Sequence, residues 1–395
     1  MAERYRLWLF MLLLGIFLLG LTDVQMISPI LPRLAKDFSV SPAMMGTAVS
    51  AYAMTAAIWA LMIGPLSDQI GRLIFLRAAA FIFAGAALVA YFAAQFEHYL
   101  LARVLAGLAG GTISACVIAQ VADLFDYAAR GRAMGWLGAI YFIAAVFAVP
   151  LGAWITSVWG WRILYVALAG FAFMIGLLIR PRSFVAAAQQ LEAKFDAAQF
   201  QRQLKNYGHY LAEKRTLSGL LLAMMVSSTV AGVVTYLGLW LNTAFAMTLA
   251  TIGVVFMVTG VTSVIGALCG GWLSDKLGKR QLIAGGSLLL ALVLCTAPLV
   301  QNRTGVFIFC AAGGLAMALR EGPFQALISE LAPAAERGAY IALRNALSQL
   351  AIAAAVAICG LLFERTGFHA IAYFAAGCSV VACGLAWWIV EPARK

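Results

Sequence analysis

Four charged residues stand inside long apolar stretches of this sequence, where charge is costly. Asp23 and Arg103 are isolated, whereas Arg320 and Glu321 are neighbours. A charged side chain at the centre of a bilayer costs at least about 2.5–3.5 kcal/mol on insertion scales, so such residues are usually kept for binding or transferring ions. That chemistry needs a carboxyl group that exchanges a proton and a cation that holds an anionic group, and the sequence offers both.

Asp23 is the first candidate for the exchanging carboxyl group, and Arg103 is its candidate partner. With the N-terminus inside, the first apolar stretch runs outward and the fourth runs inward, so both side chains fall in the outer half of the membrane. We expect Asp23 to bind the coupling proton and Arg103 to adjust its proton affinity, because a nearby cation favours the carboxylate and apolar surroundings favour the acid. The alternative is that Asp23 lies near the helix end and meets water.

Arg320 and Glu321 form the sharpest local anomaly, near the middle of the tenth apolar stretch. Neighbours on a helix point about 100° apart, so the two need not pair with each other. Pro323 removes a backbone donor and predicts a broken helix at this depth. We expect one charge to bind an ionic substrate group and the other, Glu321, to titrate; the alternative is a structural ion pair to another helix, for example through Arg344. Further candidates for lining the same cavity are Tyr141, Tyr236 and Gln349.

No residues have the spacing of a catalytic or metal centre. The seven cysteines all fall inside apolar stretches, where buried thiols pack as small hydrophobic groups. The three histidines fall in loops or at the ends of spans, and no nucleophile triad is formed. The sequence has no nucleotide-binding loop of the form G-x-x-x-x-G-K-[ST], so ATP is not expected to act directly. We therefore predict a protein that is not an enzyme and has no metal and no cofactor.

Composition identifies the elements that must position these residues. The chain has 395 residues, of which 64% are hydrophobic and 11% charged, and its mean hydropathy is +0.94. Soluble domains are about 45–50% apolar and about 25% charged, so a soluble globular protein is excluded. The apolar runs are too long and continuous for a membrane β-barrel. We predict an all-α polytopic membrane protein with 12 transmembrane helices, near residues 7–29, 43–65, 73–95, 99–122, 133–156, 160–180, 217–241, 249–272, 281–301, 304–329, 340–363 and 368–390.

The net charge of +11 has a topological explanation. If the N-terminus is inside, twenty of the 27 Lys and Arg residues fall on the inner side and six on the outer side, with Arg320 on neither. Cytoplasmic loops of membrane proteins are enriched in Lys and Arg. We therefore expect both termini in the cytoplasm of a multi-pass protein, in a bacterial inner membrane. The lipid bilayer is then the partner of this surface, and no nucleic acid is expected.

The sequence is an internal duplication. A shift of 207 residues aligns GPLSDQIG (64–71) with GWLSDKLG (271–278), and Arg130-Gly131 with Arg337-Gly338. Six spans is an even number, so the two halves share one orientation, as in transporters whose site lies between parallel repeats near mid-membrane. We predict two pseudo-symmetric six-helix bundles, at residues 1–180 and 216–395.

Residues 181–215 are the only long polar segment, and we predict a cytoplasmic linker there. Its apolar residues fall at helical spacing with basic residues between them. This pattern is typical of an amphipathic helix that lies on an anionic inner leaflet. The alternative is a linker helix whose apolar face packs on the ends of the bundles.

Three motifs give the chain its family resemblance. GPLSDQIGRLIFLR (64–77) is similar to the signature G-x-L-[SA]-D-x-x-G-R-[RK] between the second and third helices of the major facilitator superfamily. LLARVLAGLAGG (100–111) resembles the helix 4 signature R-x-x-Q-G of proton-coupled exporters, with Ala106 in place of Gln. AVPLGAW (148–154) keeps Pro150 and Gly152 of the helix 5 antiporter signature, with Val149 where Gly is usual. Over nearly its whole length the chain resembles that superfamily, and its second and third motifs resemble those of the 12-span drug and metabolite:proton antiporters.

The resemblance implies a cytoplasmic gate. In this sequence the gate consists of Asp68, Arg72 and Asp123, a clasp that would hold the outward-open state and break on opening inward. The 207-residue shift predicts a second cluster in the other half. The alternative is a static surface salt bridge, worth about 0–1 kcal/mol. The members of the second cluster are Asp275, Lys279 and Glu330.

These observations and the resemblance predict a secondary active transporter. We expect proton-coupled export of a small organic compound by alternating access, in which Asp23 is protonated from outside and releases its proton inside in exchange for substrate. One alternative is a symporter or uniporter that takes up a nutrient or an organic anion, with Arg320 as the anion clamp. A remote alternative is a receptor on the same fold that does not transport. The resemblance implies a monomer.

Overall fold

The computed structural model describes residues 2–125, 127–179, 207–332 and 337–388. Within these ranges every regular element is a helix, and 12 helices are long and apolar enough to cross a membrane. This confirms the predicted all-α class and the 12 predicted spans. Most of the predicted linker, at residues 181–206, lies outside the described residues.

The first six spans form the N-bundle. Its fifth span is divided into α5, a π-helical turn η1 and α6, which the sequence analysis did not predict. Such π-helical turns within α-helices are frequent at functional sites. The elements of the N-bundle are α1 (Ala2–Asp37), α2 (Pro42–Ile70), α3 (Arg72–Tyr91), α4 (Phe96–Leu124), α5 (Tyr127–Ile143), η1 (Ala144–Ala148), α6 (Val149–Trp159) and α7 (Trp161–Leu178).

The last six spans form the C-bundle, and a short helical stretch at residues 207–212 precedes it. Pro323 does not break its fourth span, because α13 runs through the proline without interruption; the predicted broken helix is therefore wrong. The C-bundle contains α10 (Lys214–Phe245), α11 (Leu249–Leu277), α12 (Lys279–Cys295), η2 (Ala297–Leu299), α13 (Arg303–Leu331), α14 (Arg337–Thr366) and α15 (Phe368–Trp388).

A close contact accommodates Pro323. The proline has no N–H group, so it leaves the carbonyl of Leu319, four residues earlier, without its helical donor. Gly270 of α11 lies against that carbonyl, and a Cβ atom at this position would sit 2.3 Å from the Leu319 oxygen. Glycine is therefore required for the backbone of α11 to approach α13 here.

The two bundles repeat each other element by element. The 207-residue shift carries both ends of α2 onto those of α11, and both ends of α4 onto those of α13. It also relates the positive-φ glycines that end spans in each half, Gly71 with Gly278 and Gly160 with Gly367. Positive φ suits glycine because it has no Cβ. The structure thus has the predicted pseudo-symmetry.

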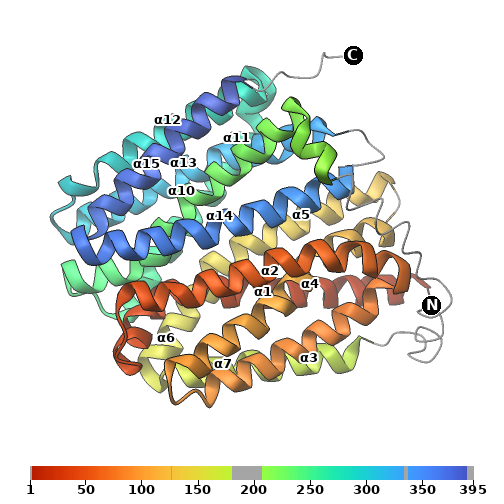
Figure 1. Ribbon diagram of the computed structural model, residues 1–395, viewed down its shortest axis with the longest axis horizontal. Helices are drawn as coiled ribbons and strands as arrows, with labels where there is room; N and C mark the ends of the chain where they lie inside the picture. Colours follow the sequence, from red (N-terminus) through yellow and green to blue (C-terminus); the bar gives the residue numbers. More distant parts are fainter. Residues whose placement is uncertain (1, 126, 180–206, 333–336, 389–395) are drawn as a thin grey trace.

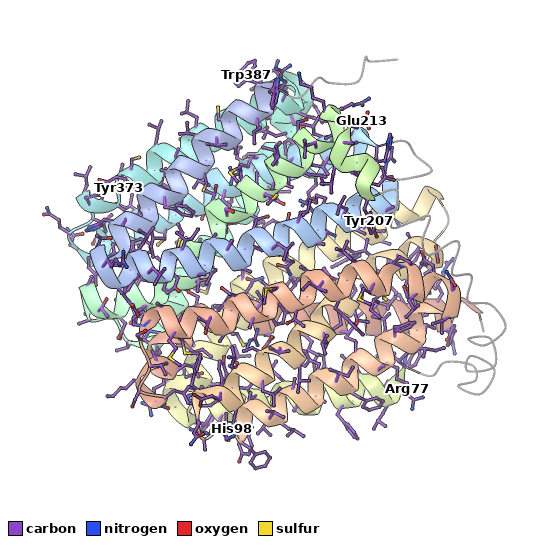
Figure 2. All side chains as sticks on the ribbon, in the orientation of Figure 1. Arg77, His98, Tyr207, Glu213, Tyr373 and Trp387 are labelled. Atoms are coloured by element: carbon purple, nitrogen blue, oxygen red, sulfur yellow. The ribbon has the colours of Figure 1, made fainter. Side chains whose placement is uncertain are left out.

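The bundles lie side by side with their long helices roughly aligned (Figure 1). α1 begins and α15 ends at one end of the molecule, which we name the terminal face; the other end is the opposite face. Tyr207 and Glu213 lie at the terminal face, whereas Tyr373 lies toward the opposite face (Figure 2). The most extensive contacts between the bundles are those of α2 with α14, α6 with α11, and α1 with α10.

The bundles are sealed together in the opposite half of the molecule. Among the described residues three hydrogen bonds join the bundles, and all lie there. The amide of Ala43 donates to Glu364 Oε1 at 2.9 Å, and Ser50 Oγ donates to the carbonyl of Ala353 at 2.8 Å. Ser28 Oγ of α1 donates to the carbonyl of Val234 of α10.

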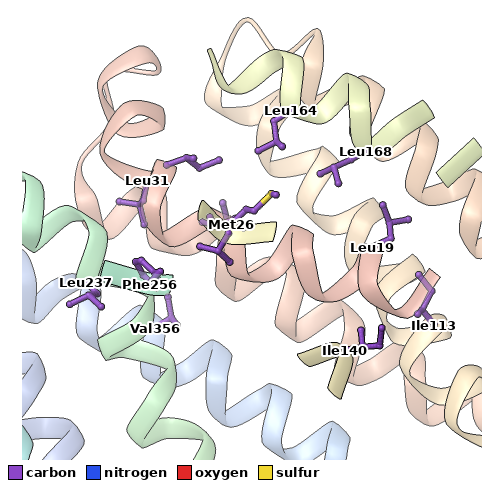
Figure 3. Close-up of a cluster of buried hydrophobic side chains, with 14 of the residues drawn as sticks. Leu19, Met26, Leu31, Ile113, Ile140, Leu164, Leu168, Leu237, Phe256 and Val356 are labelled. Carbon is purple, nitrogen blue, oxygen red and sulfur yellow. The ribbon is translucent and has the colours of Figure 1, made fainter. Parts of the chain in front are cut away.

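Apolar packing completes this seal. Leu237, Phe256 and Val356 of the C-bundle pack in one cluster with Met26 and Leu31 of α1 (Figure 3). Because these contacts and the hydrogen bonds lie in the same half, the structure has the two bundles closed against each other toward the opposite face.

Candidate functional site

Asp23 and Arg103 form an ion pair in the interior of the N-bundle. Arg103 Nη1 lies 2.9 Å from Asp23 Oδ1 and 2.8 Å from Oδ2, and each side chain is only 2% exposed. The structure therefore brings the two residues together, and Asp23 is shielded from bulk water in this conformation. Breaking a buried pair by removing one partner is strongly destabilising, whereas a complete pair is tolerated.

The helix packing around Arg103 explains the glycines of its motif. The guanidinium lies over the ring of Tyr52 of α2, with Cζ 4.6 Å from the ring centroid. A Cβ at Gly107 would sit 2.6 Å from the Tyr52 carbonyl oxygen, and one at Gly110 would sit 2.0 Å from its hydroxyl. Both positions must lack a side chain for α2 and its tyrosine to pack against α4.

A small cavity adjoins the ion pair. It has a volume of about 10 Å³ and is lined by Asp23, Arg103, Phe83 and Tyr165, with alanines of α3 and α4. That is room for about one water molecule. Arg103 Nε is buried without a hydrogen-bond partner in the described chain. The polar side of the cavity continues through Tyr165, whose hydroxyl lies 2.8 Å from that of Tyr99.

Arg320 lies in the interior of the C-bundle, contrary to the expectation that it lines a central cavity. Its side chain is fully buried, and Nη1 donates to Ser287 Oγ at 2.8 Å and to Ser379 Oγ at 3.3 Å. Its Nε and Nη2 atoms are buried without a partner among the described residues. The side chain points toward α12 and α15 because these helices supply the serines on that side of α13.

Glu321, the neighbour of Arg320, instead faces the N-bundle. Its carboxylate is in electrostatic range of Tyr141 of α5. Tyr141 is 43% exposed, and its interaction with Glu321 spans the two bundles. We refer to the region between these two side chains as the hollow. Glu321 accepts a hydrogen bond from Gln325 Nε2 at 2.7 Å, and Gln325 is itself exposed.

Arg344 of α14 belongs to the same hollow, a role that the sequence analysis considered only as a structural pair. It is half-buried, interacts electrostatically with Glu321, and lies over Phe324 at 4.9 Å. Its Nη1 donates to Asn345 Oδ1 at 2.8 Å. The position of Arg344 inside the predicted span 340–363 could have identified it as a candidate from the sequence. We name Tyr141, Glu321, Gln325, Arg344 and Asn345 the interbundle site.

The two remaining cavity candidates, Gln349 and Tyr236, lie in different parts of the molecule. Gln349 is half-buried on α14, one turn after Asn345. Tyr236 is fully buried in the seal, where its hydroxyl donates to the Val356 carbonyl at 3.2 Å. A Cβ at Gly46 of α2 would sit 1.9 Å from that hydroxyl, so Tyr236 is clamped between the bundles rather than exposed to a cavity.

The helix 5 signature also lies at the seam between the bundles. Pro150 is the second residue of α6, which follows the π-helical turn, and α11 approaches it so closely that a Cβ at Gly253 would sit 3.1 Å from Pro150 Cα. Gly152 faces α1, where a Cβ would sit 2.6 Å from Met26 Cε. The two residues therefore permit close contacts of α6 with both α11 and α1.

The predicted gate clusters form in both bundles. Arg72 donates to Asp68 Oδ1 at 2.6 Å and also pairs with Asp123. Lys279 pairs with Glu330. Each bundle thus joins residues 51 positions apart. The sixth member, Asp275, is exposed and has no ion pair within the part of the chain that the structure describes.

Neither ion pair connects the two bundles, because each lies within its own bundle. Both are intact in this structure, although the bundles are sealed in the opposite half, the state in which the predicted clasp would break. A link across the bundles at the terminal face involves Tyr207, which packs with the C-bundle and is in electrostatic range of Asp68. Burial, and next the charge of Asp68, raise the pKa of the Tyr207 phenol, so it stays neutral.

Among the described residues, no group of three or more His, Cys, Asp or Glu side chains is arranged to hold a metal ion. The chemistry of the arrangement therefore lies in two places. One is the buried Asp23–Arg103 ion pair inside the N-bundle, and the other is the interbundle site, which contains a carboxylate and a guanidinium that form no ion pair with each other.

The family model described as Major Facilitator Superfamily matches residues 12–261 and again residues 216–395. YceJ, an uncharacterised MFS-type transporter of Bacillus subtilis, is 26% identical over 383 residues, covering 94% of this chain and 93% of its own. The multidrug resistance protein MdtL of Klebsiella pneumoniae is 31% identical over 148 residues, which is 38% of each chain. The solved structure of a D-xylose-proton symporter has a TM-score of 0.78 at 19% identity and covers 98% of both chains.

Proposed function

The chain belongs to the Major Facilitator Superfamily, and on that premise we propose that it exports a small organic compound in exchange for protons by alternating access. Transport follows from the family: the chain is a multi-pass membrane transporter and not an enzyme. Proton coupling, direction, a monomeric state and the bundle limits at residues 180 and 216 are part of the proposal.

The distribution of basic residues supports a cytoplasmic terminal face. Twenty of the 27 Lys and Arg residues belong to the segments on that side of the spans. Positive residues are retained on the cytoplasmic side of membranes. With this orientation in a bacterial inner membrane, the seal faces outward, and a cytoplasmic substrate reaches the interbundle site from the terminal face.

The observation that carries the proton coupling is the sealed Asp23–Arg103 pair. When Asp23 is ionised, it neutralises Arg103 in an apolar bundle core. Protonation of Asp23 removes that charge and leaves a buried cation without a counter-ion, which is costly. The protonated state therefore favours a rearrangement that brings Arg103 another partner or water.

The helix α1 can transmit this rearrangement to the seal. Ser28, which bonds to Val234 of the C-bundle, lies five residues after Asp23 on the same helix. At a rise of 1.5 Å per residue, the two lie about 7.5 Å apart along the axis. A movement of α1 at Asp23 therefore reaches the contact that joins the bundles, as alternating access requires.

Two observations bear on the direction of transport. The similarity to MdtL, whose name describes multidrug resistance, supports export but covers 38% of the chain. Arg344 in the interbundle site favours the second candidate, uptake of an organic anion with protons. The fold does not separate the two, because the D-xylose-proton symporter shares it.

Respiring inverted membrane vesicles test the proposal. Their lumen is acid and their outer surface is the cytoplasmic side, so an exported compound enters in exchange for lumenal protons. We expect at least one of ethidium, chloramphenicol, phenylalanine and tryptophan to raise the lumenal pH, followed by acridine orange fluorescence. Asp23→Asn should abolish the response.

The matched control is Asp37→Asn, the same change on the same helix, which should retain the response. Equal responses of Asp23→Asn and wild type contradict proton coupling through Asp23. A compound that moves only with the proton flow, after the gradient is reversed, contradicts export and favours the symport alternative.

A further inference from the structure

The interbundle site carries two opposite charges that do not neutralise each other. Glu321 and Arg344 interact electrostatically, but no ion pair within 4.0 Å joins them, although both lie in the described part of the chain. They come from different helices of the C-bundle, α13 and α14. Separated charges in a low-dielectric setting are costly unless a ligand completes them.

Each charge keeps free bonding capacity. Within the described chain Glu321 accepts one hydrogen bond, from Gln325 Nε2, and its second carboxylate oxygen has none. Arg344 donates from Nη1 to its own neighbour Asn345, and its Nε is buried without a partner. The guanidinium lies over the ring of Phe324, with Cζ 4.9 Å from the ring centroid, and its remaining N–H groups can bond an incoming group.

The neighbouring cation, Arg320, is also in electrostatic range of Glu321, but it forms no hydrogen bond with it in the described chain. Although Arg320 precedes Glu321 in sequence, its guanidinium bonds to Ser287 and Ser379 inside the C-bundle. Glu321 therefore presents a negative charge to the hollow, and Arg344 a positive one. Tyr141 of the N-bundle is exposed and in electrostatic range of Glu321, and its ring provides an apolar face with a polar edge.

We propose that the interbundle site binds zwitterionic organic compounds, with the cationic group on Glu321, the carboxylate on Arg344 and an apolar body against Tyr141. Guanidinium groups hold carboxylates through two parallel hydrogen bonds, and ammonium groups pair well with a single carboxylate. A compound with only one of these groups leaves the other protein charge unpaired. This inference rests on the proposed transport function and names its substrate class.

Sets of compounds that differ only in charge test the inference. We would measure thermal unfolding of the purified full-length protein in detergent with phenylalanine, phenethylamine and 3-phenylpropionate, and with tryptophan, tryptamine and indole-3-propionate. The zwitterion of at least one set should bind about tenfold or more tightly than both of its partners, since a hydrogen bond to a charged group contributes about 1.5–3 kcal/mol. Equal binding of the amine or the acid overturns the proposal, and so does failure of both zwitterions to bind.

Variants assign each charge. Glu321→Gln should weaken binding of the zwitterion about tenfold and leave binding of the matching carboxylic acid unchanged. Arg344→Gln should also weaken binding of the zwitterion about tenfold, but leave binding of the matching amine unchanged. The matched controls are Glu97→Gln and Arg365→Gln, which are exposed near the opposite face and should bind as wild type does. The double variant Glu321→Arg/Arg344→Glu should recover zwitterion binding, and a double variant that folds without recovery overturns the proposal.

Failure of this inference is distinguishable from failure of the proposed function. The binding measurement uses no proton gradient, whereas the vesicle measurement requires one. Zwitterion binding without proton movement in vesicles contradicts the coupling alone. Proton movement driven by a cation or a neutral compound, with no zwitterion bound, contradicts the substrate class alone.

Discussion

The two bundles share one scaffold, yet each buries an arginine in a different way. In the N-bundle, Arg103 binds both oxygens of Asp23 and is neutralised. In the C-bundle, Arg320 donates to two serine hydroxyls and forms no ion pair with any described residue. Only the first arrangement contains a carboxylate whose protonation would change the charge next to its arginine. This difference supports the proposal that the coupling proton binds in the N-bundle.

The internal repeat preserves the charged residues of the gate clusters, but not those of the Asp23–Arg103 pair or of the interbundle site. The 207-residue shift carries the Arg72–Asp123 pair onto Lys279–Glu330. It relates Asp23 to Val230, Arg103 to Cys310, Glu321 to Ser114 and Arg344 to Leu137. Every charge of the proton pair and of the interbundle site is therefore unique to one bundle. This pattern fits the proposal, in which the gate residues act in the relative motion of the bundles and the unpaired positions bind the proton and the substrate.

Breaking the N-bundle pair should give the largest effect on stability. Arg103→Met leaves Asp23 as an unpaired buried carboxylate and should destabilise the fold by about 3–5 kcal/mol at alkaline pH. Adding Asp23→Leu should return most of this loss, because both charges are then gone. Thermal unfolding followed by tryptophan fluorescence measures both variants. An unchanged melting temperature in Arg103→Met would contradict the sealed pair.

Matched glycines test how far the scaffold is shared. A Cβ at Gly107 would lie 2.6 Å from the Tyr52 carbonyl oxygen, and one at Gly314 would lie 2.6 Å from that of Thr259. Gly107→Ala and Gly314→Ala should each cost about 1–3 kcal/mol through overpacking. Their melting temperatures should fall by similar amounts, and a marked inequality would show that the bundles differ in packing as well as in charge.

The C-bundle arginine should respond in the opposite sense to Arg103. Arg320→Met removes a buried cation that has no anionic partner, so we expect no loss of stability, or a gain of about 1 kcal/mol. The same thermal unfolding measurement applies. A loss of stability as large as that of Arg103→Met would mean that Arg320 is neutralised within its bundle, and the two arginines would then not differ.

The gate pairs should have the smallest effect on stability. Asp123→Asn and Glu330→Gln remove exposed partners, whose ion pairs contribute about 0–1 kcal/mol. Both melting temperatures should stay close to that of wild type and to each other. A much larger loss in Asp123→Asn would show that the N-bundle gate has a structural role that its counterpart lacks.

Much of the fold could be predicted because its signals are long. Apolar runs of about 20 residues identify the spans. The 207-residue repeat shows that the two halves have the same fold, so the arrangement of one predicts that of the other. The sequence did not predict the π-helical turn η1, nor that α13 continues through Pro323. Both lie where another helix packs closely, as in the approach of Gly270 to the Leu319 carbonyl, and such contacts cannot be read from one segment of sequence.

The sequence predicted how deep in the membrane each site residue lies, but not which way its side chain points. Counting residues along α1 and α4 places Asp23 level with Arg103, and the structure joins them. The rotation of a helix about its axis is not readable when both its lipid-facing and protein-facing sides are apolar. For this reason Arg320 was expected in the cavity and lies inside its bundle, and Tyr236 lies in the seal.

Infrared titration of the purified protein tests the central claim most directly, because it detects a protonated carboxyl group. The account predicts a carboxylic acid band that grows as the pH falls, is missing in Asp23→Asn and is retained in Asp37→Asn. An identical titration in Asp23→Asn and wild type would contradict the assignment of the coupling proton to Asp23.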